Sequence, residues 1–165
     1  MCSAGRTVLH HASMSGSAEC IRLICAHSSP PNINALDVDG MSALMYACAN
    51  GHADCVRELL SHAANVSLRD REGRMTTHHA AASNSDEIMR FLAAAAAEQG
   101  TTTMIFDVAD LSGATPLCVA VAADNANVAR LLLRLGADPA IAMEMANGTC
   151  RRYCQKLLAM FFADI

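Results

Sequence analysis

Apolar residues recur along this chain in a stripe that suits one face of a helix, and the stripe returns four times. Counted from Gly5, Gly40, Gly73 and Gly113, the residues 15, 16, 19 and 20 positions later are apolar in every copy. They are Cys20, Ile21, Ile24 and Cys25; Cys55, Val56, Leu59 and Leu60; Ile88, Met89, Leu92 and Ala93; and Val128, Ala129, Leu132 and Leu133. Such spacing places side chains on one side of a helix. The pattern predicts four equivalent amphipathic helices.

A shorter apolar helix is expected before each of these, because an alanine follows every glycine by seven residues. These alanines are Ala12, Ala47, Ala80 and Ala120. Ser42 suits an N-cap, and Thr115 followed by Pro116 suits a first helical turn. The residues expected to end the short helices, Gly16, Gly51, Asn84 and Asp124, tolerate left-handed backbone. Asp37 followed by Gly40 indicates a tight turn before the second copy.

The glycines are separated by 35, 33 and 40 residues. A period near 33 residues is typical of solenoids built from small stacked units. One pair of short helices cannot bury its apolar stripe alone, whereas neighbouring pairs can bury it together. The sequence therefore predicts an all-α solenoid in which helix pairs stack side by side.

The fourth copy resembles an ankyrin repeat, through Gly113-Ala-Thr-Pro-Leu117 and then Leu131 to Pro139 with its Gly-Ala-Asp-Pro ending. The first and second copies are similar. The third is a weaker match, because Thr76 and Thr77 stand where the family has Pro and Leu. The resemblance covers about residues 5–139 and implies helix-turn-helix-hairpin units. Their expected bounds are about 1–36, 37–69, 70–109 and 110–148, within an ankyrin-like region of 1–148.

The third connection carries an insertion at 98–105, after an alanine run, Ala93 to Ala97, that we expect to lengthen the preceding helix. Insertions in repeat proteins map to loops on one face. The segment from Thr101 to Phe106 is β-prone and partly apolar. It is either a tolerated loop or an additional contact for a partner.

The two ends of the chain depart from the repeat. Residues 149–165 are expected to form a capping helix, with Cys150, Cys154 and other apolar residues on one side. Alternatively, Phe161 and Phe162 dock into another subunit. The first unit lacks the Asp-led turn, so the chain is either a native short form or part of a longer protein.

Composition and charge narrow the function classes. The chain is 53% hydrophobic with a net charge of -4, which argues against strong nucleic-acid binding. No charge-free run, Phe91 to Ala97 included, is long enough to span a membrane. With no apolar leader between Met1 and Arg6, a cytoplasmic or nuclear location is the default. The eight cysteines are then interpreted as reduced small hydrophobes.

Histidine pairs raise the question of a metal site. His10-His11 and His78-His79 occupy matching positions, but adjacent helical residues point about 100° apart and cannot share one ion. No catalytic or cofactor fingerprint is present. The resemblance implies that the imidazoles of His10 and His78 bond the backbone of the neighbouring hairpin, with His52 similar. We expect no metal, no cofactor and no enzymatic activity.

An arginine follows each glycine by seventeen residues, at Arg22, Arg57, Arg90 and Arg130. This ladder is interpreted as a solvated convex face. The alternative is a row that meets an acidic surface or phosphate, which would give salt-sensitive nucleic-acid binding.

In the family that the chain resembles, hairpin tips and the exposed side of the first helix contact partner proteins. The matching positions form the candidate partner-binding set. They are Arg6, Met14, Ser15, Leu36, Val38, Asp39, Met41, Asn50, Arg69, Arg71, Glu72, Arg74, Ser83, Leu111 and Ser112. Arginine with Met and aliphatic residues suits a protein interface. Arg69, Arg71 and Arg74 either pair with a partner's carboxylates or are neutralised locally by Asp70 and Glu72.

The function expected from these observations is non-catalytic protein–protein interaction, as an adaptor or scaffold that binds through its concave surface. A fixed structural subunit of a large assembly is the first alternative, motivated by the high apolar fraction and by Phe161-Phe162. A Cys/His metal-binding or enzymatic protein is the weaker alternative. The identity of the partner does not follow from the fold.

Overall fold

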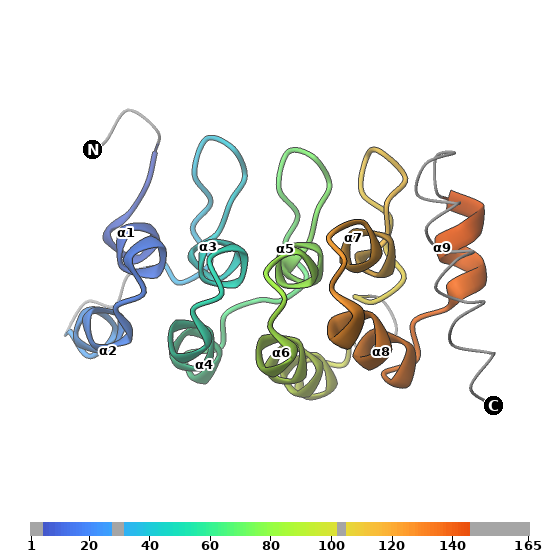
Figure 1. Cartoon of the computed structure of the whole chain (residues 1–165). Coiled ribbons are helices and arrows are strands. Elements are labelled where there is room, and N and C mark those ends of the chain that lie inside the picture. Colours follow the sequence, from blue (N-terminus) through green and yellow to red (C-terminus); the bar gives the residue numbers. More distant parts are fainter. Residues whose placement is uncertain (1–4, 28–31, 102–104, 146–165) are drawn as a thin grey trace.

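The computed structural model describes residues 5–27, 32–101 and 105–145. Apart from one isolated bridge between Leu36 and Ser42, the regular structure of these residues is α-helical and forms two parallel rows (Figure 1). The inner row contains α1 (Val8–Ser15), α3 (Ala43–Ala49), α5 (Thr76–Ala82) and α7 (Pro116–Ala122). The outer row contains α2 (Ala18–Cys25), α4 (Ala53–Ser61), α6 (Asp86–Glu98) and α8 (Ala126–Arg134). Helix α9 (Pro139–Met145) follows at the end of the stack.

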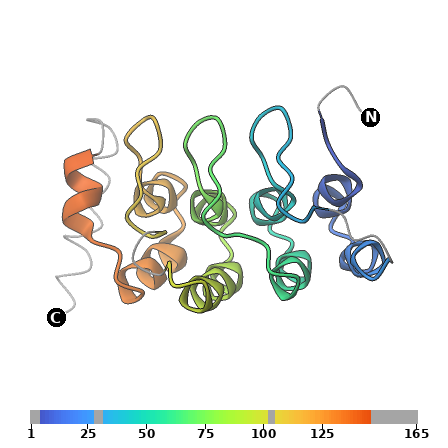
Figure 2. The ribbon, with the colours of Figure 1, turned by 180° about the vertical axis from the view of Figure 1, so that it is seen from behind.

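Each helix pair packs only on its neighbours. Inner helices contact the next inner helix, outer helices contact the next outer helix, and α7 also contacts α9. The connections before α3, α5 and α7 form hairpins that project from the inner row, away from the outer helices, in both views (Figures 1 and 2). The predicted all-α solenoid is confirmed.

The ends of the short helices follow the expected chemistry. The Ser42 hydroxyl accepts the N–H of Met45 at 3.2 Å, and Thr115 accepts the N–H of Cys118 at 3.4 Å. All four residues expected to stop these helices have positive φ. The values are 75° at Gly16, 73° at Gly51, 55° at Asn84 and 59° at Asp124.

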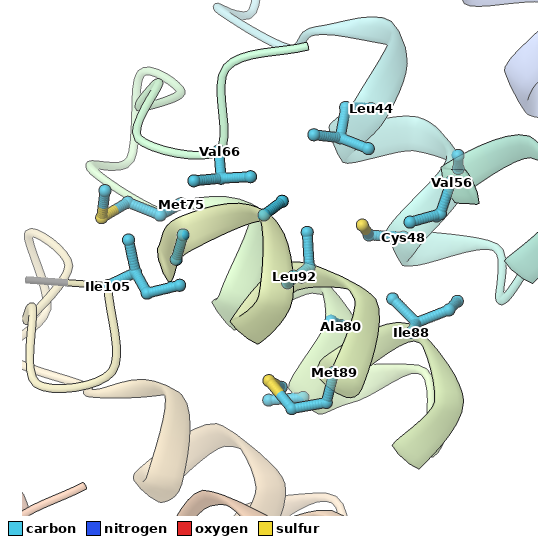
Figure 3. Packing of buried hydrophobic residues seen from close by; sticks show 14 of the residues in the cluster. Leu44, Cys48, Val56, Val66, Met75, Ala80, Ile88, Met89, Leu92 and Ile105 are labelled. Atoms are coloured by element: carbon cyan, nitrogen blue, oxygen red, sulfur yellow. The ribbon is translucent and has the colours of Figure 1, made fainter. Parts of the chain in front are cut away.

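The apolar stripe of the outer helices forms the core between units, as Figure 3 shows for the second and third. At the first stripe position, Cys55, Ile88 and Val128 are fully buried because the preceding unit covers them. Cys20 occupies the same position in α2 and is exposed. Helix α2 lies at the end of the row, where no other described helix covers that side (Figure 1). Burial of the stripe thus depends on the neighbouring unit.

Both interpretations of the insertion, a tolerated loop and a partner contact, stay predictions, because residues 102–104 lie outside the described residues. The alanine run does lengthen α6, which has 13 residues. Ile105, the last residue of the insertion, and Phe106, which follows it, are buried in the core. These two side chains are therefore unavailable as a partner contact. The Thr77 hydroxyl donates to the Ile105 carbonyl at 2.7 Å. The Thr76 hydroxyl likewise donates to the Val66 carbonyl at 2.8 Å, so both threonines that weakened the resemblance have buried, satisfied hydroxyls.

The predicted capping helix at 149–165 lies outside the described residues and stays a prediction. So does the alternative role of Phe161 and Phe162.

Two glycines of the second unit, one in the hairpin and one at the end of α3, allow backbone strain and close packing to be separated by substitution. Gly40 and Gly51 both have positive φ, but only a Cβ on Gly40 would meet backbone, 3.0 Å from the Arg71 nitrogen. Gly51→Ala should lower the free energy of unfolding by about 1 kcal/mol, from strained backbone alone. Gly40→Ala should cost about 2 kcal/mol or more, because the next hairpin must also shift. Urea unfolding measures both, and equal losses would contradict close packing of the hairpins.

Candidate functional site

Each hairpin is closed by a carboxylate inside its own turn. One oxygen accepts two backbone N–H groups, from the residues two and four positions later, at 2.8 to 2.9 Å. The three carboxylates are Asp37, Asp70 and Asp110. A turn satisfied by its own side chain is fixed before any partner arrives.

In the hairpins of the second and third units, the other carboxylate oxygen forms a hydrogen bond with a side chain of the inner helix. The Tyr46 hydroxyl donates to Asp37 at 2.7 Å, and His79 Nε2 lies 3.0 Å from Asp70. Tyr46 and His79 occupy the same position, six residues after the repeat glycine. Val119 stands there in the fourth unit, where the Ser112 hydroxyl donates at 2.7 Å to the same Asp110 oxygen that accepts the backbone N–H groups.

These contacts decide the ionisation of the hairpin carboxylates. Burial alone would raise the pKa of Asp37, but hydrogen bonds from Tyr46, two backbone N–H groups and Arg6 lower it overall. Burial likewise opposes the ionised form of Asp70, and the backbone N–H, side chain and charge of Arg74 outweigh it, so its pKa is also lowered. Both carboxylates are therefore charged at neutral pH.

His79 responds in the opposite sense to its charged neighbour. Burial is the largest cause that lowers its pKa, the charge of Arg74 lowers it further, and Asp70 only partly offsets them. The imidazole is therefore neutral at pH 7, and its Nε2–H donates to the Asp70 carboxylate.

Neighbouring hairpins are joined through their backbones. The N–H of Arg71 donates to the Asp39 carbonyl at 3.0 Å, and the N–H of Leu111 donates to the Glu72 carbonyl at 2.9 Å. These bonds connect the tips of the second, third and fourth units, so the tips form one continuous row. We call this feature the hairpin row: residues 36–41, 69–74 and 109–114. Its hairpins are numbered by their units, as the second, third and fourth hairpin in that order.

The expected bonds from the His10 and His78 imidazoles to the backbone of the neighbouring hairpin are confirmed. His10 Nε2 lies 3.0 Å from the Met41 carbonyl oxygen, and His78 Nε2 lies 3.1 Å from that of Ala114. Their Nδ1 atoms accept backbone N–H groups, so Nε2 carries the proton and donates to the next unit. His52 Nε2 makes a longer contact, 3.4 Å from the Met14 carbonyl.

The structure places the apolar candidates of the hairpin row at its surface. Leu36 and Val38 are each 44% exposed and Leu111 is 80% exposed. The polar candidates Asp39, Arg69, Arg71, Glu72 and Ser112 are also exposed. Large apolar side chains held in solvent on a fixed backbone are typical of binding surfaces.

The arginine candidates divide into two kinds. Arg74 Nε lies 3.0 Å from the Asp70 carboxylate and its Nη1 lies 2.9 Å from Glu72, so this arginine is neutralised locally. Arg6 is similarly engaged, 3.3 Å from Asp37 and over the Tyr46 ring. By contrast, Arg69 and Arg71 form no ion pair with any described residue.

The candidates on the inner helices are mostly occupied by their own helix ends. The Ser15 and Ser83 hydroxyls each donate to a carbonyl three residues earlier, and the Asn50 amide donates to the Tyr46 carbonyl. Met14 is exposed, and Met41 is half-buried beside the His10 contact. The hairpin row therefore offers more unengaged surface than the inner helices.

The outer face carries the arginine ladder. Arg22, Arg57 and Arg90 pair with carboxylates in the first turn of their own helices, and Arg22 also pairs with Glu58. A groove of about 230 Å³ lies between α4 and α6, lined by Arg57, Phe91 and Glu98 among others. Neither His nor Cys lines it.

The described residues hold neither a metal-binding cluster nor a membrane-spanning helix. No group of three or more His, Cys, Asp or Glu side chains in 5–27, 32–101 and 105–145 could hold a metal ion. None of the described helices is both long enough and apolar enough to cross a membrane.

Comparison with known families agrees with this geometry. The family model "Ankyrin repeats (3 copies)" matches residues 1–70 and 65–142. The chain belongs to the ankyrin-repeat family. No curated protein matches it. Ankyrin repeats are generally protein–protein interaction modules, and proteins of the family are typically non-catalytic.

Sequence reasoning missed three residues that tie this ankyrin-repeat protein together. His79 and Tyr46 hold hairpin carboxylates, and Asn125 donates across units to the Ala81 carbonyl at 2.8 Å. Aligning the copies by their glycines places Tyr46 and His79 in one column. A polar residue in this column of the short helices was the signal that could have indicated the bonds of Tyr46 and His79 to the hairpins.

The buried histidines predict a loss of stability in mild acid. As pH falls through about 6.5, the unfolded chain protonates these side chains while the folded chain resists. Stability from His78 and His79 is therefore complete above about pH 6.5 and falls towards their lower folded pKa values. The loss is roughly 1.4 kcal/mol per histidine for each pH unit between folded and unfolded values.

His79→Tyr tests this, because tyrosine at the same repeat position already donates to Asp37. The variant should lose less unfolding free energy than the wild type between pH 8 and pH 5, measured by urea unfolding. His27→Tyr, at an exposed position, is the control and should keep the wild-type profile. An unchanged pH profile in His79→Tyr would refute the assignment of a neutral buried imidazole.

Proposed function

We propose that this protein is a non-catalytic adaptor that binds a partner protein through the hairpin row. The observation that carries the proposal is the exposure of Leu36, Val38 and Leu111 on turns whose backbones are already hydrogen-bonded. Binding to ordered turns avoids much of the entropy cost of fixing loops. Modest apolar contacts along the row then suffice for useful affinity.

Three buried cysteines support this non-catalytic assignment. Cys48, Cys55 and Cys118 are buried, and burial raises the pKa of the Cys48 and Cys55 thiols. A protonated, buried thiol is a poor nucleophile and a poor metal ligand. The thiols act as small core side chains, in keeping with a reducing cytoplasmic or nuclear location.

The alternative of a fixed assembly subunit rests on the high apolar fraction of the chain and on Phe161 and Phe162, which lie outside the described residues. No contact of the described chain favours it over an adaptor.

Affinity capture from native extract tests the proposal with matched variants. Val38→Glu and Leu111→Glu place a charge on the hairpin row without removing any of its hydrogen bonds. Both should reduce recovery of specific partners about tenfold or more, as expected when an apolar anchor is lost. Quantitative mass spectrometry of the captured proteins provides the measurement.

Leu23→Glu is the control, because Leu23 is also apolar and 63% exposed but lies on the outer helix α2. It should leave partner recovery unchanged. Equal recovery with all three variants, or equal loss with all three, would contradict binding through the hairpin row.

A further inference from the structure

The hairpin row has an arrangement of charge that its fold does not require. We propose that it recognises an extended acidic segment of a partner protein, in which one carboxylate lies between two apolar side chains. This inference rests on the proposed function and adds the chemistry of the bound segment.

The positive centre of the row lies on the third hairpin. Arg74 pairs with both Glu72 and the buried Asp70 carboxylate inside the turn, so its charge is already engaged. Arg69 and Arg71 remain, exposed and without an ion pair to any described residue. A guanidinium in this state is suited to bind a carboxylate through paired hydrogen bonds.

An exposed carboxylate on the second hairpin limits where the acidic group can sit. Asp39 is exposed on the second hairpin, and its carbonyl accepts the Arg71 N–H. It disfavours a second carboxylate at that hairpin, so the row fits one acidic residue and not an acidic run. The net charge of -4 for the chain and the presence of Asp39 also favour a peptide over a nucleic acid.

Apolar side chains flank this centre on both sides. Leu36 and Val38 lie on the second hairpin and Leu111 lies on the fourth. Leu111 approaches the third hairpin closely, since a Cβ on Gly73 would be 3.2 Å from its Cγ. The row therefore alternates in the order apolar, cationic, apolar along the stack.

The spacing of the units sets the register of the bound segment. Packed helices lie roughly 8–10 Å apart, so neighbouring hairpin tips are separated by a similar distance. A polyproline II segment rises about 3.1 Å per residue and returns to the same side every third residue, after about 9 Å. The matching pattern is an apolar residue, an acidic residue three positions later and an apolar residue three positions after that.

A phage-displayed library of random heptapeptides, selected on the full chain, tests this pattern. Enriched peptides should carry Asp or Glu at the centre with aliphatic residues three positions away on each side. Their affinity, measured by fluorescence polarisation, should fall about tenfold or more with the double variant Arg69→Glu/Arg71→Glu. Replacing the central acid by Lys should restore binding to that variant, which shows that it is folded.

Arg57→Glu/Arg90→Glu on the outer helices is the matched control and should bind like the wild type. Peptides without an acidic residue that are lost with Val38→Glu would overturn the charge pattern but leave the proposed function standing. No enrichment, or peptides insensitive to every hairpin variant, would overturn both. A single-stranded oligonucleotide that binds the wild type more tightly than any selected peptide, and not the Arg69→Glu/Arg71→Glu variant, would replace the acidic peptide with nucleic acid.

Discussion

Every helix pair in this protein buries its apolar stripe against the neighbouring pair, and the rest of the structure depends on that stacking. The first stripe position shows the dependence within one molecule. Cys55, Ile88 and Val128 are buried because a unit precedes each of them, whereas Cys20 is exposed at the end of the row. Since no unit has a closed core of its own, stability is shared along the stack and the spacing of the units is fixed by it.

That spacing brings the separate hairpins into one continuous row, through which we propose that the protein binds its partner. The carboxylates of Asp37, Asp70 and Asp110 close the individual turns, and backbone bonds from Arg71 and Leu111 join adjacent ones. Because these bonds use backbone groups and buried side chains, the exposed side chains at the tips carry little structural duty. Their identity can therefore serve recognition without cost to the fold.

The sequence was sufficient to predict the structural features that recur in every copy of the repeat. The glycine register predicted the helix pairs and the residues with positive φ, and the ankyrin resemblance implied the inter-unit bonds of His10 and His78. It was insufficient where copies differ. In the weak third unit, Thr77 donates to the Ile105 carbonyl, which is 28 residues away and belongs to an insertion that the repeat pattern cannot place. Likewise, Arg74 forms ion pairs with Asp70 and Glu72, whereas Arg71 forms none with the described residues. This difference depends on side-chain geometry, which the sequence does not give.

The continuity of the hairpin row is the claim most directly open to measurement, by hydrogen exchange of individual backbone amides under native conditions. The amides of Arg71 and Leu111 lie at exposed tips, yet each donates to the adjacent hairpin. Both should therefore exchange far more slowly than the same amides in an unstructured peptide. Exchange of Arg71 and Leu111 at the rate of an unstructured peptide would show that the hairpins move independently and would contradict it.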